Sequence, residues 1–200
     1  MAAHFATAVI IPIKSFDDAK ERLASVLDAA ERHKLAMYTA SRVIAAASPF
    51  AVFIVCDDDE VMQFARQHGA VAILQQSSGL NNAAQEGLNA ARDDGFSWAI
   101  IAHSDLPLAT DFQHLLEDSM SKTSLGLVAD QTSDGTNVLV IATDCEFEFH
   151  YGPGSFQAHC DEATRRGYVL RLIDDPALAV DIDTPKDLVH LPDDWQTVTL

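Results

Sequence analysis

The chain alternates short apolar runs with longer segments in which apolar and polar positions mix. The apolar runs are rich in Val, Ile and Leu and carry few charges. Near-continuous apolar runs of this length are typical of strands that are buried on both faces of a sheet. We therefore expect strands at residues 7–13, 51–56, 71–74, 98–102, 125–129, 138–141 and 168–173.

The segments between these runs carry helix signals. Asp28 followed three residues later by Glu31 is a capping box, and Ser48-Pro49 ends the helix that it opens. Met37, Ala40, Ile44 and Ala47 form one apolar stripe on that helix. We expect further helices from the acidic turn at 57–59 to about 68, over 80–93, 111–119 and 155–166, and from Thr184-Pro185 onward, with Pro185 in the first position and Asp187 in the third.

Strands that alternate with helices along the whole chain predict an α/β fold. A mostly parallel central sheet with helices on both faces satisfies this pattern. The chain of 200 residues shows no low-complexity linker and no break in composition, so we expect a single domain over residues 1–200. In such a sheet, ligands bind at the carboxyl ends of the strands, and the residues that follow each strand are the first candidates for a site.

Composition narrows the possible partners. The formal net charge of -17, with no basic stripe, argues against nucleic acid as a ligand. No apolar run approaches the roughly 20 residues that cross a bilayer, and the N-terminal stretch carries no basic leader. The three cysteines form no C-x-x-C pair. We therefore expect a cytoplasmic protein that binds neither membrane nor nucleic acid.

Cationic residues concentrate after the first predicted strand. Lys14, Lys20 and Arg22 lie within nine positions of a chain that holds only 13 Lys and Arg residues. Lysine and arginine in a loop suit triphosphate oxygens, although a solvated basic turn would have the same composition. The G-x-x-x-x-G-K-[ST] and G-x-G-x-x-G fingerprints are both absent.

Aspartates follow two later segments. Asp105 ends the run 100–105, and Asp181 and Asp183 stand two apart, so that in an extended backbone both point to the same side. Carboxylates that converge on one point need a cation, and together these residues predict a site for one or two Mg²⁺ ions. The alternatives are a turn or cap role for Asp105 and capping of the last helix by one of the pair, although Thr184 already serves as that cap.

Two loops with small residues can accept an anion. Thr136 precedes a strand, and Gly152 and Ser155 precede a helix whose free N–H groups and dipole favour negative charge. We interpret them as the cradle for the phosphate and carboxylate of an acceptor, with ordinary turn chemistry as the alternative. Asn81, at the start of another helix, is a candidate for contact with a base or ribose. His150, His159 and Cys160 match no zinc site, and structural roles are expected for them.

The motifs IIPIKSFDDAKERL, GLNNA, HSDLP, DGTNVL, YGPGSFQAH and DIDTPKDL occur in this order over residues 9–188. As an ordered set they resemble the guanylyltransferases of coenzyme F-420 (deazaflavin) biosynthesis. The resemblance implies a single-domain nucleotidyltransferase fold of the glycosyltransferase-A-like, Rossmann-like type, with Pro12-Ile13-Lys14 in place of the Gly-Gly of the wider superfamily. It implies metal ligation by Asp105, Asp181 and Asp183. It further implies contact of Thr136, Gly152 and Ser155 with the phosphoacid, and of Lys14, Lys20 and Arg22 with the GTP triphosphate.

The implied reaction joins GMP from GTP to the phosphate of 2-phospholactate, phosphoenolpyruvate or 3-phosphoglycerate and releases pyrophosphate. The product would pass to a deazaflavin transferase, and a homodimer is expected by analogy with many α/β nucleotidyltransferases. The competing functions are a molybdopterin guanylyltransferase, a sugar-phosphate cytidylyltransferase, a glycosyltransferase of similar fold, and a catalytically silent nucleotide-binding regulatory protein. The missing glycine pair counts against the first two.

Overall fold

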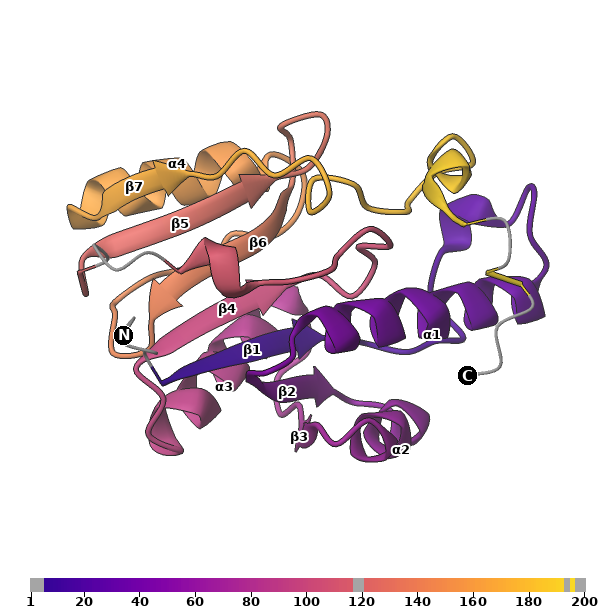
Figure 1. The fold of residues 1–200 in the computed structure, drawn as a ribbon, viewed down its shortest axis with the longest axis horizontal. Coiled ribbons are helices and arrows are strands. Elements are labelled where there is room, and N and C mark those ends of the chain that lie inside the picture. The colour runs from indigo at the N-terminus through magenta and orange to yellow at the C-terminus, as the bar shows by residue number, and fades with distance from the viewer. Residues whose placement is uncertain (1–5, 117–120, 193–194, 197–200) are drawn as a thin grey trace.

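The computed structural model describes residues 6–116, 121–192 and 195–196. A seven-stranded sheet runs through the centre in the order β3-β2-β1-β4-β6-β5-β7 (Figure 1). All seven predicted strands are confirmed within a residue or two at each end. Their bounds are β1 Thr7–Pro12, β2 Ala51–Cys56, β3 Val71–Leu74, β4 Trp98–Ala102, β5 Ser124–Ala129, β6 Thr136–Ala142 and β7 Val169–Leu172.

The sheet is mostly parallel, as predicted. Strand β1 pairs in parallel with β2 and β4, β2 with β3, and β5 with β7. Strand β6 lies antiparallel between β4 and β5. The start of β6, at Thr136, therefore lies at the same edge of the sheet as the carboxyl ends of β1 and β4. The reversed strand thus adds Thr136 and the turn before it to the edge where ligands are expected.

Helices cover both faces of the sheet, because side chains alternate along each strand. Val9 and Ile11 point to the face covered by α1 (Ala29–Ala46) and α2 (Asp59–Gln67). Ala8 and Ile10 point to the face covered by α3 (Leu80–Asp93) and α4 (Ser155–Arg166). Both faces are packed with buried aliphatic residues, which explains the near-continuous apolar runs in the sequence.

The predicted start of α1 is confirmed in detail. The Asp28 carboxylate accepts from the backbone N–H of Glu31, and the Glu31 carboxylate accepts from that of Asp28, both at 2.9 Å. Asp58 caps α2 by accepting from the N–H groups of Glu60 and Val61. Helix α3 lies against β1 through Gly87, where a Cβ atom would collide with the Ile10 side chain. The start of α3 is therefore held close to the ends of β1 and β2.

Two helix predictions were wrong. In place of a helix over 111–119, the structure has a single 3-10 turn at Gln113–Leu115, and residues 117–120 lie outside the described part. The Arg171 guanidinium donates to the Leu115 carbonyl, the oxygen that a longer helix would need. In place of a terminal helix starting at Thr184-Pro185, a 3-10 turn spans Asp187–His190.

The expected cap at Thr184 is also wrong. The Asp187 carboxylate accepts from the N–H groups of Asp183 and Thr184 and from the Thr184 hydroxyl, at 3.0, 2.6 and 2.9 Å. Asp187 thus caps the residues that precede it, and in the described part of the chain Thr184 caps nothing that follows it. The backbone becomes extended at Leu191, which is buried in a cluster with Leu35 and Tyr38 of α1, and the 3-10 turn ends there.

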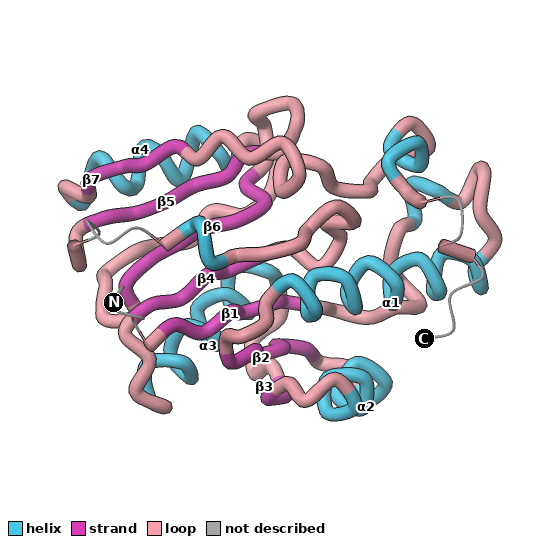
Figure 2. The backbone as a smooth tube through the Cα atoms, viewed as in Figure 1, coloured by secondary structure: helices cyan, strands magenta, loops and turns pink. Residues whose placement is uncertain are grey.

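The segment after β7 returns across the molecule toward the N-terminal loop. Leu23, Leu35 and Tyr38 form a third apolar cluster with Ile182, Leu191 and Trp195. In Figure 1 the C-terminal turn lies beside the segment that precedes α1. Loops rather than helices follow the ends of β1, β4 and β7 (Figure 2), so the three segments with candidate site residues meet at one edge. Among the described helices, none has the length and apolar character that crossing a membrane requires.

Candidate active site

Three cavities open at the carboxyl ends of the strands, and Pro12 at the end of β1 lines all three. The first, of about 500 Å³, lies under the loop after β1 that carries Lys14, Lys20 and Arg22, which we call the cationic loop. The second, of about 450 Å³, is lined by the candidate aspartates and by the two loops before β6 and α4, which we call the acceptor loops. The third, of about 250 Å³, lies between the ends of β2 and β3 and the start of α3. Asp105 lines both the first and the second cavity, and Lys14 lines the first and the third.

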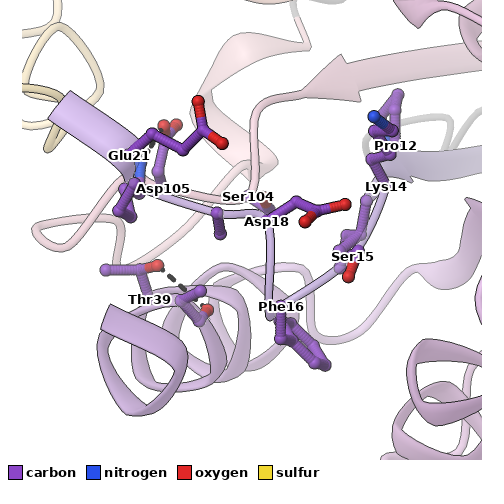
Figure 3. Close-up of a pocket in the computed structure, with 13 residues that line it drawn as sticks. Pro12, Lys14, Ser15, Phe16, Asp18, Glu21, Thr39, Ser104 and Asp105 are labelled. Atoms are coloured by element: carbon purple, nitrogen blue, oxygen red, sulfur yellow. Dashed lines mark hydrogen bonds and ion pairs between the residues drawn. The ribbon is translucent and has the colours of Figure 1, made fainter. Parts of the chain in front are cut away.

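The first cavity is bounded by the loop that follows β1 and by Ser104 and Asp105 after β4 (Figure 3). Lys14 is exposed at its rim. Lys20 takes the left-handed backbone conformation, with φ of 61°, which is uncommon for a residue with a side chain. This geometry turns its side chain inward, where only 8% of it is exposed. Backbone strain of this kind is found where a side chain has to be held in place.

Asp105, Asp181 and Asp183 come together as the sequence predicted. Each offers a carboxylate oxygen, and these oxygens lie within 4.8 Å of one another. The Ile182 N–H donates to the Asp105 carbonyl at 3.2 Å, and its side chain is fully buried on the opposite side. Asn137 also anchors this segment by donating to the carbonyls of Leu178 and Ala179, at 3.0 and 3.1 Å. The alternation along the chain thus directs both carboxylates of the pair toward Asp105.

The charges in this cluster are partly balanced by the cationic loop. The Lys20 ammonium lies 2.5 Å from Asp105 and 3.7 Å from Asp183, and the Arg22 guanidinium lies 3.3 Å from Asp183. Burial alone would raise the pKa of Asp105, but Lys20 and His103 outweigh it and hold that pKa below its usual range. For Asp181, burial and then the charges of Asp105 and Asp183 raise the pKa to about 6. The cluster therefore carries more negative charge than its cations offset.

The donor set fits a hard divalent cation. All three groups are carboxylates, the ligands that Mg²⁺ prefers, and they converge from two segments of the chain. Asp105 Oδ1 is buried and has no hydrogen-bond partner in the described part of the chain. A buried carboxylate oxygen without a partner is costly, and a cation shared with Asp181 and Asp183 would satisfy it.

The second cavity contains two of the three predicted acceptor contacts. Gly152 and Ser155 line it. The Ser155 hydroxyl oxygen accepts from the Thr136 N–H at 2.9 Å, which leaves its own hydrogen free to donate into the cavity. Thr136 is fully buried and lies outside the cavity lining. Its side chain faces His159, so a contact with the acceptor would have to come from its backbone or from a rearranged side chain.

His159 connects the acceptor loops to α4, a role that its sequence position did not reveal. It is fully buried, and burial lowers its pKa to about 4, so the ring is neutral near pH 7. The His150 N–H donates to Nε2 at 2.9 Å, which places the proton on Nδ1, and Nδ1 then donates to the Thr136 hydroxyl at 2.9 Å. His159 follows Ser155 by one helical turn, and this spacing is the signal that could have linked the two residues.

Asn81 does not line any of the three cavities. Its side-chain oxygen accepts from the Tyr151 N–H at 2.6 Å and so ties the start of α3 to the acceptor loop. His103 and Tyr151 line the second cavity with their rings 5.5 Å apart. Burial lowers the pKa of His103, and the Asp105 charge only partly offsets this effect. The only local signal for a role of His103 is its position two residues before Asp105 in the sequence.

Solved structures of other proteins share this fold. Over 92% of this chain and 93% of the other, the structure is similar to 4-diphosphocytidyl-2C-methyl-D-erythritol synthase from Anaerococcus prevotii (TM-score 0.60, 12% identity). It is also similar to CMP:2-keto-3-deoxy-manno-octonic acid synthetase complexed with CTP, over 92% and 95% of the two chains (TM-score 0.56, 12% identity). These likenesses define the fold class, which agrees with the expected glycosyltransferase-A-like nucleotidyltransferase.

The family is narrower than the fold class. Residues 7–192 match the family described as guanylyl transferase CofC like, and the chain belongs to this family. A phosphoenolpyruvate guanylyltransferase from Rubrobacter xylanophilus is 35% identical and covers 91% of each chain. A 2-phospho-L-lactate guanylyltransferase from Methanocaldococcus jannaschii is 32% identical over 90% of this chain and 80% of its own. The resemblance read from the motifs is therefore confirmed.

Proposed function

We infer that this protein is a guanylyltransferase of coenzyme F-420 biosynthesis. It transfers GMP from GTP to the phosphate of a small phosphorylated carboxylic acid and releases pyrophosphate. One observation carries this proposal: the three-aspartate cluster lies between a cavity under the cationic loop and a cavity at the start of α4, and Asp105 lines both. Family membership and the names of the relatives support the same reaction.

The cavities suit the two substrates. The triphosphate would lie in the first cavity, where Lys14 and Lys20 neutralise the leaving pyrophosphate, with Arg22 lining a neighbouring hollow that shares Lys20. The acceptor would lie in the second cavity, with its carboxylate or phosphate at the start of α4 and the Ser155 hydroxyl donating to it. An acceptor phosphate oxygen attacks the α-phosphorus of GTP, the bond from that phosphorus to the pyrophosphate oxygen breaks, and pyrophosphate leaves with its negative charge.

No general base is needed in this reaction, because the acceptor phosphate is already ionised near pH 7. The protein's contribution is to position two anions and to neutralise their charge. Asp105, Asp181 and Asp183 are the residues that would hold one or two Mg²⁺ ions, which supply charge neutralisation between the two substrates when bound. Lys20 must then exchange its contact with Asp105 for contact with phosphate oxygens.

The acceptor is one of three closely similar acids in this proposal: phosphoenolpyruvate, 2-phospholactate or 3-phosphoglycerate. Relatives named for the first two acids match most of the chain. We further propose that the protein is cytoplasmic and forms a homodimer, and that its product passes to a deazaflavin-consuming transferase. Light scattering of the purified chain tests the dimer independently of activity.

Pyrophosphate release tests the reaction. Purified protein is incubated with Mg²⁺, GTP and each phosphoacid in turn, with ATP, CTP and UTP in parallel, and product masses are recorded. Release with one phosphoacid and a mass equal to acid plus GMP would support the proposal and identify the acceptor. No release with any of the three acids, even with a deazaflavin acceptor and its transferase present to consume the product, would overturn it. Binding of GTP without turnover would then favour a silent nucleotide-binding protein.

A further inference from the structure

The third cavity has the composition of a site for a flat heterocycle. Its walls include Ile13, Val55, Leu80 and Ala83, and its polar groups include Asp57 and Gln75. Lys14 lines this cavity and also the first cavity, where the triphosphate is proposed to bind. A nucleotide with its phosphates beside Lys14 would therefore place its base between these apolar walls. Apolar walls with a few polar groups at one side are typical of small-molecule sites.

Asp57 is an available hydrogen-bond acceptor in this cavity. Of the three consecutive aspartates after β2, Asp58 is occupied by the N–H groups of Glu60 and Val61. Asp57 lines the cavity and has no hydrogen bond or ion pair with the described residues. Both of its carboxylate oxygens are therefore available to a ligand.

Gln75 presents a second acceptor. Its side-chain nitrogen donates to the carbonyls of Ser77 and Gly79, the latter at 2.9 Å. Because both partners are carbonyls, the amide nitrogen must face them, and the amide oxygen is left as the free group. The cavity thus offers acceptors at two positions, which is the complement of a base edge that carries donors.

Guanine carries such an edge. Its N1–H and N2–H groups are adjacent parallel donors, and a carboxylate can accept both. Adenine and cytosine place an unprotonated ring nitrogen beside their amino group, and uracil places its N–H between two carbonyls. A carboxylate would face at least one lone pair on each of those bases. Charge-assisted pairs of this kind are stronger than neutral ones, and a mismatch leaves the charged group unsatisfied.

We propose that Asp57 selects guanine by accepting from its N1–H and N2–H groups, with the Gln75 amide oxygen as a further acceptor for the amino group. This proposal rests on the proposed function and names the residue that reads the nucleotide. It assigns to Asp57 the base contact for which Asn81 was a candidate, since the Asn81 oxygen is occupied by the Tyr151 N–H.

The test exchanges donor and acceptor between protein and base. In Asp57→Asn, the amide oxygen still accepts from N1–H, but its NH₂ group faces the guanine amino group. Xanthosine triphosphate carries a carbonyl in place of that amino group, so the amide can donate to it. We expect the parent to favour GTP over xanthosine triphosphate by about 100-fold or more in kcat/KM, and Asp57→Asn to reverse the preference. Inosine triphosphate, which lacks the amino group, should be a poor substrate for the parent.

Asp59→Asn is the matched control, because it removes the same charge two residues away at a position that lines none of the three cavities. It should keep the parent's preference for GTP. Calorimetric binding of GTP and xanthosine triphosphate with Mg²⁺ gives the same comparison without turnover. If the parent binds GTP but transfers it to no phosphoacid, the proposed function fails while the base assignment is still tested.

Three outcomes would overturn the assignment. The first is unchanged GTP affinity in Asp57→Asn. The second is weaker binding of GTP and xanthosine triphosphate together, with loss of the preference for GTP over 2′-deoxy-GTP, which would place Asp57 at the ribose. The third is equal binding of CTP and GTP by the parent. Thermal melting of both variants confirms that each is folded before these comparisons are made.

Discussion

The ion pair between Lys20 and Asp105 predicts that removal of the Lys20 charge lowers the stability of the protein as well as its activity. Lys20→Met keeps the length of the side chain and requires the same left-handed backbone, so it removes little besides the charge. The parent pair is largely buried, with 8% of the Lys20 side chain and 17% of the Asp105 side chain exposed. Removing one member of a buried pair costs about 3–5 kcal/mol, because the other charge is left without compensation.

The expected loss of unfolding free energy in Lys20→Met is smaller, at about 2–3 kcal/mol. Asp183 is half exposed and keeps its contact with Arg22, so the loss of Lys20 costs little at this carboxylate. Only the buried contact with Asp105 is lost without replacement. For a domain of this size, each kcal/mol shifts the melting temperature by about 2–4 °C. We therefore expect Lys20→Met to melt roughly 4–12 °C below the parent at pH 7 without added metal.

Lys14→Met is the matched control. Lys14 lines the same cavity but is exposed and makes no hydrogen bond or ion pair with the described residues. Its loss should change the melting temperature by less than about 2 °C, while GTP turnover falls in both variants because both lysines are proposed to contact phosphate. Equal melting temperatures for the two variants would refute the role of Lys20 in balancing the aspartates.

Acid and Mg²⁺ provide two further readouts on Lys20→Met. Without the ammonium, burial raises the pKa of Asp105 with only His103 and a backbone hydrogen bond left to oppose it, so lowering the pH should reduce the difference in stability from the parent. Millimolar Mg²⁺ should restore part of the melting temperature at pH 7, because a cation bound by the three carboxylates replaces the missing charge. A difference between variant and parent that neither acid nor Mg²⁺ reduces would count against the charge argument.

Three further predictions address the site. Asp183→Asn should lower kcat at saturating GTP by about 1,000-fold or more with the fold intact, and activity within tenfold of the parent would exclude metal ligation by this residue. Ser155→Ala should raise KM for the phosphoacid about tenfold or more with kcat largely retained; a lower kcat at unchanged KM would place the hydroxyl elsewhere. His159, with a pKa lowered from 6.5 to about 4, contributes stability that is fully present above pH 6.5 and is lost as the pH falls toward 4, by up to about 3 kcal/mol. His159→Gln, which can donate and accept at the same positions, should show a shallower dependence in urea unfolding at pH 7, 5.5 and 4, and parallel curves would contradict the assignment.

The sheet and most helices could be predicted because their signals are local. Strands buried on both faces require near-continuous apolar runs, and the capping box at Asp28 needs only residues three apart. The helix predictions at 111–119 and after Thr184 were wrong because distant groups decide those segments. Arg171 takes the Leu115 carbonyl, and the buried Leu191 fixes the chain against α1. Neither contact has a counterpart in the nearby sequence.

The candidate site, too, was predictable only where its signals are local. The type and spacing of Asp181 and Asp183 predicted a shared cation, since alternation in an extended chain places both carboxylates on one side. The place of Asp105 beside them depends on the return of the C-terminal segment across the molecule, which Ile182 and Asn137 anchor. For Asn81 and Thr136, the structure found partners in Tyr151 and His159 that no local pattern contained.

Local sequence patterns were therefore enough to predict the α/β class, the family and the chemical types gathered at the strand ends. Contacts between distant parts of the folded chain set which of those groups face one another and which already have hydrogen-bond partners. Asp57 and Asp58 are neighbours of identical chemistry, yet one caps a helix and the other faces a cavity. The physical reason is that a polar side chain acts on a ligand only where the fold leaves its hydrogen bonds unmade, and this depends on atoms far away in the sequence.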